Sequence, residues 1–184
     1  MRTFIAIELP DTVKAELANL QAELRQTGAD VTWTKPDNIH LTLRFLGEVE
    51  ERQLDELKQL CAETAAAFQP FSLALKDTGY FPNFRQPRVL WVGLAGEMEI
   101  AKQLQKRLDA ELIARGFNQE DKPFKPHLTL GRVKSGKNLK LLVAKADMYS
   151  LPELSFEADE LVLFKSELLP AGARYTALAK WKLP

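Results

Sequence analysis

The chain has 184 residues, 46% of them hydrophobic and 27% charged, which is typical of a globular protein with a sizeable core. The 25 Lys and Arg residues balance 25 Asp and Glu residues, and this zero net charge argues against a protein that grips long stretches of nucleic acid, though not against one that handles a single terminal phosphate. The single cysteine, Cys61, excludes an internal disulfide, the start of the chain is charged too early for a signal peptide, and no apolar run could span a membrane, so we expect a cytoplasmic protein without a membrane partner.

Alternating apolar residues predict strands, and apolar residues spaced three or four apart predict helices. In the first half of the chain this predicts a strand at 3–9, a helix at 10–26, a loop or short strand at 31–38, a strand from His40 to about Gly47, and a helix at 50–68. In the second half it predicts a strand at 71–76, a turn or exposed loop at 79–87, a strand at 88–94, a helix at 97–115, and a polar loop at 118–126. A strand that begins at His127, a short helix at 139–148, and two closing strands at 156–167 and 174–183 complete the chain.

The order of these elements indicates an internal duplication, because a strand and a helix precede a similar short strand in each half. No linker or low-complexity segment separates the halves. We therefore predict an α+β fold in a single domain over residues 1–184. It should be two-lobed and pseudo-duplicated, with two antiparallel sheets that flank a central groove and with helices outside.

A four-residue sequence motif, which we call the phrase, occurs twice in the chain. It is His40-Leu41-Thr42-Leu43 in the first half and His127-Leu128-Thr129-Leu130 in the second, and the protein has no other histidine. Side chains two apart on a strand share a face, so the histidine and threonine of each copy should face one way and the two leucines the core. Two such strands side by side would bring two imidazoles and two hydroxyls together.

A pair of imidazoles suits a reaction in which one proton is taken and another is given. With an unperturbed pKa of about 6.5, a pair can hold one charged and one neutral member near neutral pH. In-line attack at phosphorus has this demand, since a base deprotonates the attacking water while an acid protonates the leaving oxygen. The hydroxyls of Thr42 and Thr129 would then bind the non-bridging phosphoryl oxygens.

Three other interpretations of the histidines are weaker. A lone histidine on a strand is usually structural, but core packing gives no reason to repeat a polar face. Zinc usually takes three or four protein ligands, and the chain offers two histidines, one distant cysteine and no acidic residue inside either phrase, so we expect neither a metal nor another cofactor. A serine or cysteine nucleophile would not require the same phrase twice.

A cation should help to hold the phosphate, because hydroxyls add no positive charge. Arg132 is the best-placed candidate, although strict alternation puts it on the wrong face, and Gly131 could supply a β-bulge that turns it toward the groove. Arg44 is a second candidate because it lies on the His40 face by parity. Lys125 is interpreted as a solvated loop residue.

Aromatic side chains near the groove could stack on the terminal base of a nucleic acid. Most aromatic residues belong to the core, but a loop at 79–87 would not bury both of its phenylalanines. The candidates are Phe4, Trp33, Phe81, Phe84 and Tyr175.

The paired His-x-Thr-x phrases resemble the two-histidine phosphoesterase superfamily. Within it, the chain is most similar to the bacterial and archaeal RNA 2′,3′-cyclic phosphodiesterases, also called 2′–5′ RNA ligase-like proteins. The similarity extends in family order over nearly the whole chain, through residues 4–10, 38–47, 88–94, 124–130 and 174–176 with Trp181.

This resemblance implies a two-lobed fold with a groove lined by both phrases, and metal-independent hydrolysis of a terminal 2′,3′-cyclic phosphate to a 2′-phosphate. It implies that His40 is the proton donor to the departing 3′ oxygen and that His127 is the proton acceptor that activates water. An arginine at position 132 fits the family pattern. Arg44 is not a fixed feature of that pattern, so its candidacy depends on strand parity alone.

Three functions follow as hypotheses. The leading one is a cyclic phosphodiesterase that acts as a monomer on RNA 3′ ends or nucleotides bearing a 2′,3′-cyclic phosphate, reversible in principle as 2′–5′ RNA ligation. The second keeps the chemistry but acts on small cyclic nucleotides, such as an ADP-ribose cyclic phosphate, or on 2′,5′-linked oligonucleotides. The third, of another class, is a non-catalytic module that binds RNA ends, which the zero net charge disfavours.

Overall fold

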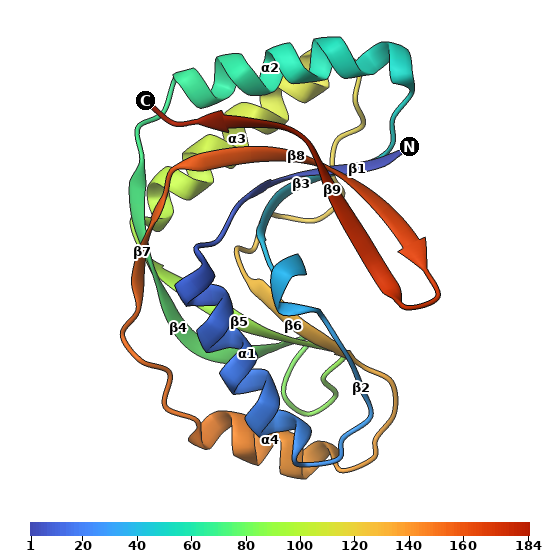
Figure 1. The fold of residues 1–184 in the computed structure, drawn as a ribbon, viewed down its shortest axis with the longest axis vertical. Coiled ribbons are helices and arrows are strands. Elements are labelled where there is room, and N and C mark those ends of the chain that lie inside the picture. The colour runs from blue at the N-terminus through green and yellow to red at the C-terminus, as the bar shows by residue number, and fades with distance from the viewer.

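The computed structural model describes all of residues 1–184, and its nine strands form two antiparallel sheets (Figure 1). The four-stranded sheet has the order β3-β1-β8-β9 and the five-stranded sheet the order β2-β6-β5-β4-β7. The strands of the first sheet are β1 (Arg2–Ile7), β3 (Leu41–Glu48), β8 (Glu160–Leu169) and β9 (Gly172–Lys182). The strands of the second sheet are β2 (Val31–Trp33), β4 (Phe71–Phe81), β5 (Val89–Gly96), β6 (Leu128–Val133) and β7 (Ser155–Ala158).

Helices cover the outer face of each sheet. The helices α2 (Leu54–Ala66) and α3 (Met98–Ala114) pack against each other over the first sheet, and α1 (Asp11–Arg25) and α4 (Leu139–Met148) lie beside the second (Figure 1). The short 3-10 turns η1 (Pro36–Asn38) and η2 (Glu51–Gln53) precede β3 and α2. The predicted α+β architecture, with two antiparallel sheets and outer helices, is confirmed.

The two halves of the chain are interleaved. Helix α1 follows β1 of the first sheet, yet its Gln21 side chain donates a hydrogen bond to the Leu130 carbonyl of the second sheet at 2.9 Å. Helix α3 follows β5 of the second sheet, yet it packs against β3 of the first. One cluster of 34 buried apolar residues accordingly contains side chains from both sheets.

Strand β4 corrects the prediction of a loop over residues 79–87, because it runs through Gly79 to Phe81. A β-bulge between Leu75 and Thr78 interrupts the pairing with β5, which then resumes with Gly79 opposite Trp91. A Cβ at position 79 would collide with the Trp91 indole, so the glycine makes room for that ring. Gly79, which suggested a turn in the sequence, instead lies within a strand and leaves space for a neighbouring side chain.

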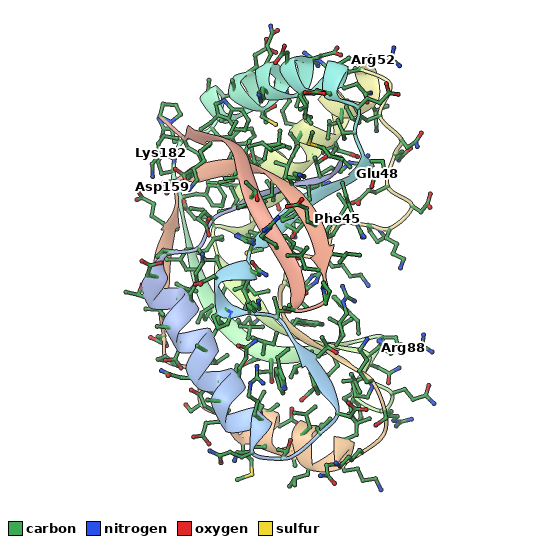
Figure 2. The ribbon with its side chains drawn as sticks, turned by 45° about the vertical axis from the view of Figure 1, so that its right-hand side comes forward. Phe45, Glu48, Arg52, Arg88, Asp159 and Lys182 are labelled. Carbon is green, nitrogen blue, oxygen red and sulfur yellow. The ribbon has the colours of Figure 1, made fainter.

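The predicted strand at 156–167 is wrong as a single element. The chain leaves the second sheet after β7, which pairs with β4, and enters the first sheet as β8, which pairs with β1 and β9. The switch occurs at Asp159, whose carboxylate forms an ion pair with Lys182 at 2.8 Å (Figure 2). Alternation stops at the adjacent Asp159 and Glu160, and a continuous apolar run follows at 161–164. This break does not by itself indicate that the chain changes sheets.

Candidate active site

The two repeated phrases line one groove of about 890 Å³ between the sheets. His40 and Thr42 lie at the start of β3 in the first sheet, His40 just before the strand, and His127 and Thr129 lie likewise at the start of β6 in the second. The four leucines of the phrases are fully buried in the shared core: Leu41, Leu43, Leu128 and Leu130. The predicted division of each phrase into a groove face and a core face is confirmed.

His40 lies immediately before β3 and is only 7% exposed. Its ring packs among aromatic side chains, with centroid distances of 4.5 Å to Phe164, 5.9 Å to Tyr175 and 6.2 Å to Phe4. Its Nε2 lies 3.3 Å from Oε1 of Glu8, while Nδ1 is buried without a hydrogen-bond partner. The first imidazole is therefore a buried ring with a carboxylate at one nitrogen.

His127 has a different environment. Its Nδ1 lies 2.6 Å from the Lys125 carbonyl oxygen, so Nδ1 carries the proton and donates it to that oxygen, which leaves Nε2 as the acceptor of the neutral ring. The ring stands edge-on to Phe81, with centroids 4.8 Å apart. Burial lowers the pKa of His127, the hydrogen bond to Lys125 opposes this, and the charge of Arg132 adds to the lowering. The net lowering favours the neutral form that a general base requires.

Each phrase is followed by a β-bulge that changes which residues face the groove. In the first sheet Thr42 pairs with Ala6 but Arg44 with Ile5, so one residue is extra. In the second sheet Thr129 pairs with Trp91 and Gly131 with Leu90, with the same shift. Past each bulge, the residue that strict alternation would place in the core faces the groove instead.

The bulge in β6 turns Arg132 to the groove, as predicted from Gly131. Arg132 pairs in register with Val89, which also lines the groove. Its charge lowers the pKa of His127 in the second sheet and acts in the same direction on Tyr175 of the first sheet, where burial is the larger effect and raises the pKa. The charge of this one guanidinium therefore lowers the pKa of a titratable side chain on each wall of the groove, although burial outweighs it at Tyr175.

Because of the bulge in β3, strict alternation along the strand no longer predicts that Arg44 shares a face with His40. The side chain borders the groove but is buried, and its guanidinium forms ion pairs with Asp109 of α3 at 2.9 Å and with Glu120 at 3.5 Å. It also donates a hydrogen bond to the Asn118 carbonyl. Two carboxylates neutralise this cation, so its geometry suits anchoring the 117–125 loop rather than holding a phosphate.

Three of the aromatic candidates line the groove, namely Phe4, Phe81 and Tyr175. Phe84 is not among the groove residues; it is 60% exposed in the loop after β4 and lies under the Arg85 guanidinium. Trp33 is likewise absent from the groove and packs against the core below Arg25. Lys125 is exposed as predicted. Its backbone carbonyl oxygen also orients the His127 ring, a role that the sequence analysis did not predict.

Sequence reasoning missed two groove neighbours. Phe45 is 57% exposed at the groove, 6.0 Å from the Phe4 ring, and the bulge in β3 puts it at the position that Arg132 occupies in the other half. Glu8 contacts His40. The bulge expected from Gly131 in the second copy could have been carried over to the first by aligning the two phrases, but nothing in the local pattern links Glu8 to His40.

No three His, Cys, Asp or Glu side chains gather closely enough to hold a metal ion. None of the helices combines the length and the apolar run needed to cross a membrane.

Known proteins resemble this chain over its whole length. The sequence pattern of the family described as LigT-like phosphoesterase matches twice, at residues 7–91 and 92–175, once in each half. A protein of Methanothermobacter thermautotrophicus named RNA 2′,3′-cyclic phosphodiesterase is 34% identical over 184 residues, covering 100% of this chain and 99% of the relative. A protein of the same name from Thermotoga maritima is 36% identical and covers 97% of this chain and 93% of the relative.

Solved structures agree with this result. A crystal structure from Thermus thermophilus matches with a TM-score of 0.80 and 34% identity, covering 100% of this chain and 98% of the other. The E. coli LigT structure in complex with 3′-AMP matches with a TM-score of 0.75 and 30% identity, covering 99% and 97%. The resemblance inferred from the two phrases is confirmed. The chain belongs to the LigT-like phosphoesterase family of the two-histidine superfamily.

Proposed function

We propose that this protein hydrolyses the terminal 2′,3′-cyclic phosphate of RNA to a 2′-phosphate, with His40 as the proton donor and His127 as the proton acceptor. The observation that carries the proposal is that both imidazoles, both threonines and Arg132 line one groove. Two relatives that cover nearly the whole chain bear the name of this activity, and a nucleotide, 3′-AMP, is bound to the similar E. coli protein.

The chemistry follows from the state of each ring. The free Nε2 of neutral His127 removes a proton from water, and the resulting hydroxide attacks phosphorus in line with the bond to O3′. That bond breaks, and protonated His40 gives its proton to O3′, which leaves a 3′-hydroxyl and a 2′-phosphate. His127 ends protonated and His40 neutral, and exchange with solvent restores both.

The groove also provides groups for the charge that develops on the phosphoryl oxygens. The hydroxyls of Thr42 and Thr129 can each donate a hydrogen bond to a non-bridging oxygen, and Arg132 supplies the positive charge. The reaction so described requires no metal. If an RNA 5′-hydroxyl takes the place of water, the same proton transfers produce a 2′–5′ linkage, so the protein would also ligate.

The experiment is a turnover assay with an oligonucleotide that ends in a 2′,3′-cyclic phosphate. Wild type should release the 2′-phosphate, chelator should leave the rate unchanged, and His40→Ala or His127→Ala should lower kcat by about 10²- to 10⁴-fold while the circular dichroism spectrum stays native. Full activity in either variant would contradict the mechanism. Tight binding of the cyclic end by wild type with no turnover would instead favour a binding module.

A second candidate substrate is a small nucleotide, which the 3′-AMP complex of the E. coli relative favours. The exposed Phe45 at the groove offers a ring to a terminal base, and a mononucleotide could use it as well as an oligonucleotide could. Comparing kcat/KM for the cyclic-ended oligonucleotide and for a cyclic mononucleotide separates the two. We further propose that the protein acts as a cytoplasmic monomer on either substrate.

A further inference from the structure

We propose that Glu8, fixed by Lys14, is a positioning residue that keeps the buried His40 in its protonated form and thereby makes it the acid of the pair. This inference rests on the proposed function, since it explains how two histidines with identical sequence surroundings take opposite roles.

The contact follows from strand register. Strand β1 pairs with β3 so that Ile7 lies opposite Leu41, and continuing that antiparallel register by one residue puts Glu8 opposite His40. Oε1 of Glu8 lies 3.3 Å from Nε2 of His40. The two side chains are 23% and 3% exposed, so the pair is largely shielded from solvent.

Lys14 holds the carboxylate in place. Helix α1 begins at Asp11, shortly after Glu8, and brings Nζ of Lys14 to 2.7 Å from the same Oε1. The ammonium also donates to the Asp37 carbonyl at 3.4 Å, and the Leu9 backbone N–H donates to Oε1 at 3.3 Å. The carboxylate is therefore held by the backbone just after β1 and by Lys14 of α1, and Lys14 is itself bound to η1.

Burial by itself disfavours a charged imidazole, so a buried acid needs a nearby anion. The groups around His40 come from several elements: the cation of Lys14 from α1, the neutral phenol of Tyr175 from β9, and the rings of Phe164 and Phe4 from β8 and β1. The carboxylate of Glu8 comes from the residue that follows β1. Glu8 is the anion of this set. Burial raises its pKa, but hydrogen bonds and charges from His40 and Lys14 outweigh burial and lower the pKa of Glu8 to about 2.

The second half of the chain has no carboxylate at the position opposite its histidine. Val92 pairs with Leu128, so the same continuation of register puts Gly93 opposite His127. A glycine offers no carboxylate, and the charge that acts on His127 is the cation of Arg132. The duplicated site is thus unequal at the residue opposite each histidine, with an anion beside the acid and none beside the base.

The test is the substitution Glu8→Gln, which keeps the shape and removes the charge. Because the protein has two histidines, its imidazole ¹⁵N spectrum contains two rings, and the His127→Ala variant assigns them. In Glu8→Gln, the fraction of His40 in the imidazolium form at pH 7 should fall severalfold while the His127 signals stay unchanged. The alkaline limb of the kcat profile should move by about one pH unit toward acid, with activity recovered at low pH.

Two controls separate this role from a structural one. Glu8→Asp should restore much of the imidazolium fraction, and Glu48→Gln, which removes an exposed carboxylate at the far end of β3, should change neither the spectrum nor the profile. An unchanged His40 spectrum, or a rate profile lowered equally at every pH, would overturn the inference. Failure of the parent protein to turn over substrate would overturn the proposed function, whereas the spectrum, which needs no substrate, tests Glu8 separately.

Discussion

At the scale of single residues, the two histidines share a phrase and a groove but have different polar neighbours. His40 is packed among rings with a carboxylate at Nε2, and His127 has its Nδ1 committed to a carbonyl. The phrase itself was sufficient to predict that both rings face one groove, because alternation on a strand is a local property. It could not predict the difference between the rings, because Glu8 follows another strand, Arg132 lies beyond a bulge, and the Lys125 carbonyl belongs to the loop before the phrase.

The lowered pKa of His127 predicts the acidic limb of the activity profile. The base must be neutral to act, so the rate should fall as pH drops through a value below the usual pKa of about 6.5. The folded form also binds the His127 proton less readily than the unfolded chain, so this group should contribute stability above about pH 6.5 that is lost as pH falls. The kcat profile and the denaturant midpoint between pH 5 and 8 measure the two effects.

Arg132→Ala tests the cation of the groove. Loss of a charged donor to the phosphoryl oxygens should lower kcat by about 10²- to 10³-fold, and loss of its charge should move the acidic limb toward higher pH. Arg88→Ala is the matched control, since its neighbour Val89 faces the groove and Arg88 itself projects away at the edge of the molecule (Figure 2). An equal loss of kcat in Arg132→Ala and Arg88→Ala would mean that Arg132 acts only through the overall charge of the protein.

At the scale of elements, the β-bulge that follows each phrase determines which side chains face the groove. The glycine before Arg132 gave a sequence signal for one of them, and that prediction was correct. The bulge in β3 has no glycine, so parity misplaced Arg44 and overlooked Phe45. The long β4 and the division between β7 and β8 were missed for a related reason, since pairing partners far along the chain, rather than local pattern, decide where a strand ends.

Gly131→Ala should destabilise the bulge of β6. A Cβ there would lie 2.6 Å from Cγ1 of Val31 and 3.1 Å from the Thr32 carbonyl oxygen, so β2 would have to move, at a cost of about 1–3 kcal/mol. Gly136→Ala, where no heavy atom lies within 4 Å, serves as the control. Denaturant unfolding measures both variants, and equal midpoints would contradict the role of this glycine.

Gln21→Leu should cost about 2–3 kcal/mol of unfolding free energy. The buried amide donates to the Thr34 carbonyl at 2.7 Å and to the Leu130 carbonyl at 2.9 Å, and leucine would leave both oxygens without this donor. The substitution Gln59→Leu, at an exposed position on α2, should change stability by less than about 0.5 kcal/mol. A similar effect of the two changes would mean that other contacts hold α1 to the second sheet.

At the scale of the whole molecule, the interleaved halves share one core. We propose on this basis that residues 1–184 form a single domain, as the absence of a linker predicted. Unfolding by denaturant should then be one cooperative transition, with coincident midpoints by tryptophan fluorescence and by far-ultraviolet circular dichroism. Two separated transitions would show that each lobe is stable alone.

The unequal walls of the groove have a consequence for the product. In a cavity with true twofold symmetry the two histidines would be equivalent, so either could act as the acid and either ester bond of a cyclic phosphate could break. Here one wall offers an aromatic ring at Phe45 and the other a guanidinium at Arg132, at corresponding positions. The two halves of the groove therefore differ at positions that can fix the orientation of the substrate, and we expect a single phosphate isomer as the product.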